Sequence, residues 1–296
     1  MGDSEPERPK VYRGDAKLEW LKDIKAGEKL EYQHIRGVPT GKNASKVSAD
    51  AGKLAKDVHY FPFDVLSWPA IPKLSANIER AKTGIKTIFH WHEESDYWLY
   101  QTLNDTWRKN KHRKKEKYLK PGMTVEEWYG NCPPGIPLAQ WENMVDYWQT
   151  PEFKESSARN TENREHLTEH HTFGSKSFMR HAYEIEVEIN QPATRVDIYG
   201  RTYNKSDAGK EKFRKMEELR KKAEVNGVVE SLQQLDGDSY SQTIGPDKRG
   251  RYRGVGNCIK PKKRSRGESS STSNTDDVLK DLQEHIVVID QDREEL

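Results

Sequence analysis

The residues of this chain that could do chemistry gather first in a basic run at residues 108–120, RKNKHRKKEKYLK, where only Glu116 opposes the bases. Lysine and arginine donate charge-assisted hydrogen bonds to phosphate oxygens, and arginine can donate two in parallel. Bases at a helix end also complement the helix dipole, but this density exceeds what a cap needs and adjacent like charges repel. We therefore predict DNA binding by Arg108, Lys109, Lys111, Arg113, Lys114 and Lys115.

A polar stretch between residues 159 and 177 offers a second set of donors, Arg159, Asn163, Arg164 and Lys176. Guanidinium, amide and ammonium groups are frequent partners of phosphate oxygens in protein–DNA interfaces. A solvated helix followed by a loop would have the same composition. Phosphate contact by these residues is the prediction, and a solvated surface is its alternative.

A glycine- and arginine-rich segment, IGPDKRGRYRGVGN, covers residues 244–257. Its glycines permit close backbone approach, and Arg249, Arg251 and Arg253 supply forked phosphate donors. The segment is neither a phosphate-binding P-loop, since no Gly-Lys-Ser/Thr closes it, nor a dinucleotide fingerprint, since no strand precedes it. A flexible turn is the alternative to a third DNA contact.

The sequence KPKKRSR at residues 260–266 is typical of a nuclear localisation signal. We therefore expect the protein in the nucleus, with the signal carried by Lys260, Lys262, Lys263, Arg264 and Arg266.

Histidine pairs suggest a metal site only weakly. His90 lies close to His92 in sequence, and His166 lies four residues before His170, so that a helix would place the second pair on one face. No cysteine lies nearby, no HExxH order occurs, and histidines in polar stretches are usually solvated. We expect no metal, no other cofactor and no small-molecule substrate.

The composition predicts small helical modules rather than one large core. Of 296 residues, 33% are hydrophobic and 33% are charged, and the mean hydropathy is −1.05. The formal net charge is only +2, so the distribution of the bases is informative and their total is not. No apolar run approaches a membrane span and the N-terminus has no signal peptide, so we expect a soluble intracellular protein.

The periodicity of apolar residues predicts the helices that position these side chains. A stripe of Ile78, Ala81 and Ile85 predicts a helix from Ser75, and a helix from Ser95 would bury Tyr100, Leu103 and Trp107 before it enters the basic run. Together with the Trp68-Pro69 start, residues 62–120 resemble a Myb or trihelix unit, in which a tryptophan-cored bundle presents one helix to the major groove.

Further elements are expected on both sides of this unit. A short strand is expected within residues 28–35 and a helix at 45–58. Thr150-Pro151 is a typical helix start. Helices are also expected at 178–190 and 208–225, whereas 196–199 is ambiguous, with alternation favouring a strand.

Several spaced motifs resemble the plant transposases of the Ptta/En/Spm (CACTA) family. They are W-x-x-M-V-x-x-W at 141–148, S-x-x-N-x-x-N-R at 157–164 and G-S-K-S-F at 174–178. The likeness extends upstream to residues 12–14, 37–43 and 107–109 and downstream to 192–194, 201–203 and 244–256. Tyr203 departs from it, because family members usually carry histidine there. The resemblance favours a helix at 196–199.

The resemblance implies a transposon-related function of the non-catalytic, DNA-binding kind. Transposases that cut DNA hold two divalent ions with carboxylates, usually on a mixed sheet, and this chain lacks the strand-rich pattern to carry them. We therefore expect no catalytic residues. A nuclear protein-interaction adaptor without specific DNA recognition is the alternative function, and a metal-dependent DNA strand-transfer enzyme is the least favoured one.

The expected fold is mainly α, made of small helical modules with disordered termini and linkers. The expected segments are a poorly ordered N-terminus (1–27), a basic module (28–120), a Pro/Gly linker (121–137), the transposase domain (138–258), a basic and serine-rich linker (259–277) and a short coiled-coil-like helix (278–296). DNA is the expected partner. The terminal helix, with apolar residues three or four apart, could also pair two copies of the chain, or dock on its own domain.

Overall fold

The computed structural model describes residues 18–166, 174, 176–203, 206–247 and 252–256. The predicted localisation signal, the predicted terminal helix, and Arg249 and Arg251 lie outside these residues. The helices are α1 (Ala44–Leu54), α2 (Leu74–Ile88), α3 (Asp96–Tyr118), α4 (Val125–Gly130), α5 (Leu138–Gln149), α6 (Pro151–Glu165), α7 (Phe178–Ile189), α8 (Arg195–Thr202), α9 (Asp207–Val225) and α10 (Ser239–Ile244). Short 3-10 helices η1 (Glu19–Asp23), η2 (Trp68–Ala70) and η3 (Glu93–Ser95) complete the helical elements described.

The mainly helical fold class is confirmed. The strands among the described residues are β1 (Gln33–Ile35) and β2 (Val38–Thr40), which pair antiparallel with His34 opposite Pro39. The ambiguous segment at 196–199 is helical, because Thr194 accepts the Asp197 N–H while the Asp197 carboxylate accepts the Thr194 N–H, a reciprocal cap. In the described part of the chain, no helix is long and apolar enough to cross a membrane.

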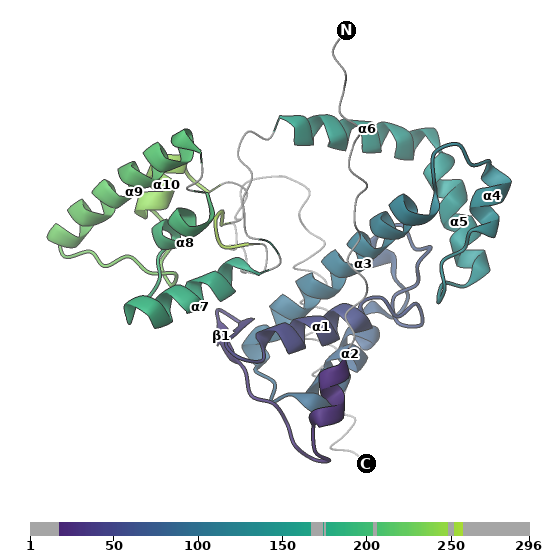
Figure 1. Ribbon diagram of the computed structural model, residues 1–296, viewed down its shortest axis with the longest axis horizontal. Helices are drawn as coiled ribbons and strands as arrows, with labels where there is room; N and C mark the ends of the chain where they lie inside the picture. Colours follow the sequence, from purple (N-terminus) through teal and green to yellow (C-terminus); the bar gives the residue numbers. More distant parts are fainter. Residues whose placement is uncertain (1–17, 167–173, 175, 204–205, 248–251, 257–296) are drawn as a thin grey trace, which may run out of the picture.

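The predicted three-helix unit at 62–120 is not confirmed. That range contains two α-helices, α2 and α3, and short 3-10 helices, and the third helix packed against them is α1, from further upstream (Figure 1). The apolar faces predicted for α2 and α3 are buried, as Ile78, Ile85 and Trp107 show. The predicted unit does not include the third helix, α1, because α1 precedes Trp68 in the sequence.

One hydrophobic core joins the N-terminal helices to the C-terminal part of the chain. Val47 of α1 and Leu103 of α3 belong to the same cluster of buried residues as Met179 and Ile185 of α7 and Leu232. The β1–β2 hairpin contacts α7, and Arg36 at its tip donates to the Leu232 carbonyl at 2.8 Å. The N-terminal module and the C-terminal helices therefore share one core.

A second cluster fastens α4 and α5 to the end of α3. Trp141 is fully buried against Phe63 and Trp148, and its indole N–H donates to the Trp128 carbonyl at 2.8 Å. Residues 121–137, expected as a linker, contain α4, whose Trp128 packs into this cluster. This Pro/Gly-rich segment is thus part of the packed structure.

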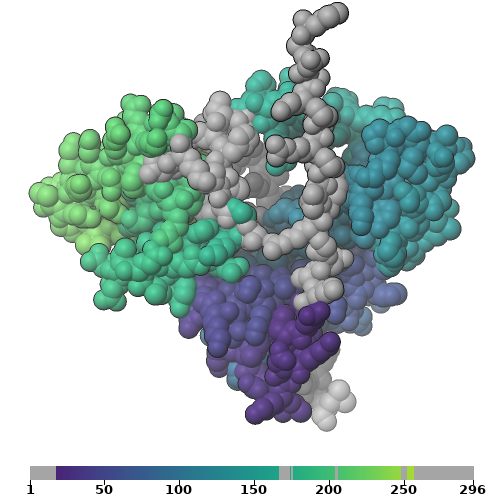
Figure 2. Space-filling model, in the orientation of Figure 1, coloured from purple at the N-terminus to yellow at the C-terminus, as the bar shows by residue number. Residues whose placement is uncertain are grey.

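Helix α6 leads from the α4–α5 group toward the α7–α10 group and has no buried residue (Figure 1). It begins as predicted, with the Thr150 hydroxyl accepting the Phe153 N–H at 3.3 Å and Pro151 in the first turn. Beyond Phe153, which packs against the Trp141 cluster, its sequence is polar, as is typical of a helix that bridges two parts of a protein through solvent. Figure 2 shows the two groups on either side of the molecule, above the N-terminal helices.

Candidate nucleic-acid interface

Helix α3 changes character along its length and carries the longest basic run of the chain. Its first half is largely buried, from Tyr97 through Leu103 to Trp107. Beyond Trp107 the helix extends toward α4 and α5 and becomes strongly basic (Figure 1). The exposure of each base decides which of them can reach a nucleic acid.

Lys111, one of the predicted DNA contacts, is buried. Its side-chain nitrogen lies 3.6 Å from the centroid of the Trp107 ring and donates to the Val65 carbonyl, and the residue is only 8% exposed. Burial lowers the pKa of Lys111 to about 7, against the opposing effect of the Asp64 charge. The structure therefore turns this lysine away from any DNA on the surface, and the predicted contact is wrong for this residue.

Lys115 also faces the protein, one turn further along the helix. Its Nζ lies 4.1 Å from the centroid of the Phe153 ring at the start of α6 and 5.8 Å from that of Trp148. Burial, and then the charge of Lys154, lower the pKa of Lys115. This residue joins α3 to α6 and is at most a partial phosphate donor.

The opposite side of α3 carries an exposed basic stripe. Lys109, Arg113 and Lys117 lie four residues apart, which places them along one face of a helix, and all three are exposed. The Lys109 Nζ atom lies 3.8 Å from the Asp105 carboxylate. Within the described residues, the structure gives these three bases no other ion pair. We call these three residues the α3 stripe.

Arg108 and Lys114 border the α3 stripe. Arg108 is exposed and donates to Asp105 at 3.1 Å, a surface pair that typically contributes little stability and can be exchanged for a phosphate. Lys114 is half-buried, with its Nζ 5.6 Å from the centroid of the Tyr118 ring. The basic run therefore divides into an exposed side, where the Lys117 Nζ lies 5.4 Å from the centroid of the Tyr118 ring, and a side held against the Trp107 and Phe153 rings.

The predicted contacts on α6 are exposed but do not form one positive face. Arg159 and Asn163 lie four apart and share their side of the helix with Glu155, whose carboxylate is 3.9 Å from the Arg159 guanidinium. Arg164 lies about 100° further round the helix axis, as the helical repeat of 3.6 residues requires. The helix as a whole carries more acids than bases, so it is a weaker candidate than α3.

Lys176 is engaged within the protein. Its Nζ lies 2.6 Å from the Glu184 carboxylate of α7, and this contact is the largest of the effects that lower the pKa of Glu184. Because both side chains are more than one-third exposed, the pair is accessible to solvent.

Arg253, predicted as a phosphate donor, instead closes the end of α10. Its guanidinium donates to the Gly245 and Pro246 carbonyls, and its backbone N–H donates to Asp247 at 2.9 Å. These bonds satisfy carbonyls just past a helix end and hold the two sides of the Gly/Arg segment together. The role found for Arg253 is structural.

Sequence reasoning missed Arg195, the most heavily bonded side chain of the C-terminal part. Its guanidinium is fully buried and donates two hydrogen bonds to the Asp238 carboxylate, from Nε to Oδ2 at 2.7 Å and from Nη2 to Oδ1 at 2.6 Å. It also donates to Asp247 at 2.8 Å and lies over the Tyr240 ring. Its place next to a helix cap in the sequence gave no sign of this, because its acidic partners are 43 and 52 residues away.

Among the described residues, one group of three side chains could together hold a metal ion, namely His34, His92 and Glu94. His90, which the sequence pairs with His92, instead lies 3.6 Å from Glu31. Burial and the neighbouring His92 lower the pKa of His34, although Glu94 opposes them. No group of three carboxylates suited to a two-metal centre occurs in the part of the chain that the structure describes.

Comparison with known proteins finds one family match, in the C-terminal part of the chain. Residues 137–262 match the family model described as plant transposase (Ptta/En/Spm family). No curated protein and no solved structure matches the chain. The matched range begins before α5 and includes helix α6 and the Arg195 cluster.

Proposed function

Because the chain carries a plant transposase domain of the Ptta/En/Spm family over residues 137–262, we propose that it binds transposon DNA without a catalytic site of its own. The observation that carries the proposal is the α3 stripe. Lys109, Arg113 and Lys117 present three adjacent exposed bases on a helix anchored in the core through Trp107. A basic stripe on a rigid element suits the spaced phosphates of a DNA backbone.

The division of the basic run supports the choice of this face. Lys111 and Lys115 are held against aromatic rings on the other side of α3, so the helix has one side for the protein and one for a partner. Exposed guanidinium and ammonium groups can contact phosphates, which positions the protein on the duplex, and can reach base edges in a groove, which gives sequence preference. Arg108 at the edge of the stripe can exchange its surface pair with Asp105 for a phosphate.

The non-catalytic part of the proposal is supported by the arrangement of the acids. Cleavage or strand transfer by a two-metal mechanism needs carboxylates that converge on two adjacent divalent ions. Among the described residues, carboxylates such as Glu155 and Glu184 are paired with bases on helix surfaces, and Asp238 is engaged by the buried Arg195. A partner protein would then supply catalysis.

The nuclear part of the proposal rests on the sequence KPKKRSR at 260–266. A cytosolic distribution of the full chain, unchanged when these bases are replaced by alanine, would contradict it.

Binding is tested with the full chain by fluorescence anisotropy on random duplexes and on duplexes enriched by repeated selection, across a salt series. We expect a preferred sequence whose binding survives physiological salt, with a salt dependence equivalent to several phosphate contacts. Affinity that vanishes equally for all sequences near physiological salt would contradict specific DNA binding. The adaptor function would then be the remaining alternative.

A further inference from the structure

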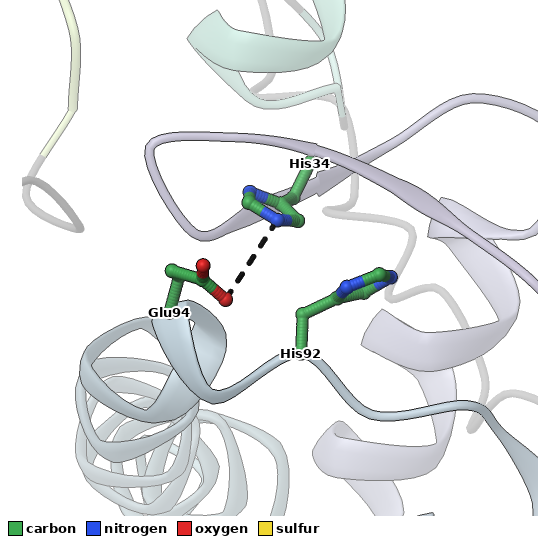
Figure 3. A group of neighbouring side chains, drawn as sticks. All are labelled: His34, His92 and Glu94. Carbon is green, nitrogen blue, oxygen red and sulfur yellow. Dashed lines mark ion pairs between the residues drawn. The ribbon is translucent and has the colours of Figure 1, made fainter.

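Two imidazoles and a carboxylate converge where the β1–β2 hairpin meets the start of α3. His34 lies on β1, whereas His92 precedes η3 and Glu94 lies in it (Figure 3). One potential ligand atom from each residue lies within 4.8 Å of the other two, and the His34 Nε2 atom is 3.9 Å from the Glu94 carboxylate. The histidine rings are tilted by 57° rather than stacked, so both can direct a nitrogen toward one point.

The ring of His92 is fixed in an orientation that suits a ligand. Its Nε2 lies 3.1 Å from the Tyr32 carbonyl, and the Tyr32 ring packs edge-on against the imidazole with centroids 4.8 Å apart. With Nε2 donating to this carbonyl, the lone pair is on Nδ1. A metal-binding histidine typically donates its other ring nitrogen in this way, which fixes the tautomer and raises the basicity of the ligand.

The hairpin lies close against η3, which keeps His34 near the other two residues. Gly37 has φ of +79°, and a Cβ atom on it would lie 1.9 Å from the Glu94 carbonyl oxygen. The hydroxyl of Tyr32 also donates to the buried Ser95 at 3.2 Å. The contact of Gly37 with η3 and the contacts of Tyr32 hold His34 and His92 in place in the absence of a metal.

We propose that His34, His92 and Glu94 bind one Zn²⁺ ion, with water in the fourth position. Two nitrogens and one carboxylate oxygen form a ligand set typical of zinc, and imidazole favours zinc over the harder Mg²⁺. Tetrahedral zinc separates its ligand atoms by about 3.3 Å, given bond lengths of about 2.0 to 2.1 Å. The site must therefore contract slightly, and the Glu94 side chain, which is 68% exposed, is free to supply the movement.

Zinc would also change one hydrogen bond in a defined way. The Gly37 N–H donates to His34 Nδ1 at 3.3 Å, which places the ring proton of the neutral imidazole on Nε2. Coordination through Nε2 moves that proton to Nδ1 and breaks the contact with Gly37. The change of tautomer is a signature that zinc bound elsewhere would not produce. This inference is independent of the proposed DNA binding.

Zinc binding is tested by calorimetric titration of the full, untagged chain after removal of metals with a chelator. We expect one ion per chain. Because H34Q and E94Q each remove a ligand, their affinity should fall by more than the roughly 10- to 100-fold typical of losing an outer-shell partner. Matched controls are E93Q, one residue from Glu94, H90Q, two residues from His92, and the triple variant H166Q/H170Q/H171Q, which removes the second histidine cluster of the sequence. These variants should bind zinc as the wild type does.

Two readouts distinguish loss of the site from loss of the fold. Zinc should raise the melting temperature of the wild type and of E93Q but not of E94Q, which has the same shape as the wild type and an exposed side chain. The ¹⁵N spectrum of the histidine rings should show the tautomer change at His34. An absence of stoichiometric binding, or binding retained in H34Q and E94Q, would overturn the proposal.

Discussion

The ammonium nitrogen of Lys111 lies 3.6 Å from the centroid of the Trp107 ring, one helical turn earlier on α3. This contact, together with the bond from Lys111 to the Val65 carbonyl, places the middle of the basic run inside the protein. The helix can therefore offer only the bases on its other side, the α3 stripe, to a nucleic acid. The account of function depends on this division.

The burial of Lys111 predicts a specific pH dependence of stability. Its pKa is about 7 in the folded protein against an ordinary 10.5, so between these values the unfolded chain binds more protons and the folded state gains stability as pH rises. Relative to K111M, in which nothing titrates at this position, wild-type stability should rise from pH 7 to 9.5 by up to about 1.4 kcal/mol per pH unit.

Urea denaturation at a series of pH values measures the difference in the free energy of unfolding between wild type and K111M. The contributions of all other titrating groups are common to both proteins and cancel in this difference. Below pH 7, where the lysine is protonated in both states, the difference between wild type and K111M should be constant. A difference that stays flat up to pH 9.5 would show that the lysine is charged and solvated in the folded protein.

Local patterns predicted much of the helical framework, because helix starts and apolar stripes depend on neighbouring residues. The Thr150-Pro151 start and the buried stripe of α2 are examples, and both are confirmed. The contacts that Lys111 and Arg253 make within the protein could not be predicted in the same way. Lys111 bonds to Val65, 46 residues away, and a basic residue in a basic run gives no sign of which side of the helix will be covered.

The candidate zinc group was beyond sequence reasoning for the same reason. His90 and His92 are close in sequence, but the structure places them against different partners. His92 meets His34, 58 positions upstream, while His90 meets Glu31. A pattern of spacing within one segment cannot reveal a group assembled from two.

The buried Arg195–Asp238 pair should be essential for the stability of the C-terminal part. Replacing Arg195 by methionine leaves the Asp238 charge buried without its partner and should destabilise the protein by about 3–5 kcal/mol. R195K keeps the charge but cannot donate two parallel hydrogen bonds to Asp238, so it should lower the free energy of unfolding by less than the methionine variant does. The free energy of unfolding in urea measures both.

Arg201 provides the control for Arg195, because its ion pairs with Glu184 and Glu188 are exposed to solvent. The substitution R201K should cost less than about 1 kcal/mol. Equal effects of R195K and R201K would contradict the importance of the buried two-point pair.

The contact between Gly37 and the Glu94 carbonyl predicts that the hairpin tolerates no side chain at this position. G37A would combine an unfavourable positive φ with a clash against backbone, and should destabilise the protein by about 2 kcal/mol or more. G84A is the matched control, since a Cβ atom there meets nothing within 4 Å and Gly84 lies inside α2. It should stabilise the protein by about 0.5–1 kcal/mol. Thermal unfolding of the two variants should therefore shift in opposite directions.

The Trp141 cluster predicts that α4 and α5 depend on the end of α3 for their structure. W141A would leave a large cavity beside Phe63 and Trp148 and remove the bond to the Trp128 carbonyl, at a cost of about 3–5 kcal/mol. Hydrogen exchange should show faster exchange in α4 and α5 than in α2. The exposed Leu138 of the same helix is the control, and L138A should change stability by less than about 0.5 kcal/mol. Uniform loss of protection across the chain would contradict this local dependence.

The most direct test of the account compares DNA binding by two triple variants of the full chain. K109Q/R113Q/K117Q removes the α3 stripe, and R214Q/K215Q/K221Q removes three exposed bases from α9 with the same change in charge. Anisotropy across a salt series should show the logarithmic salt slope of the stripe variant reduced by about 0.9 per lost phosphate contact, while the α9 variant keeps nearly the wild-type slope. Equal losses in the two variants would mean that net charge alone drives binding. A wild-type slope in the stripe variant would place the DNA on another face and contradict the central claim.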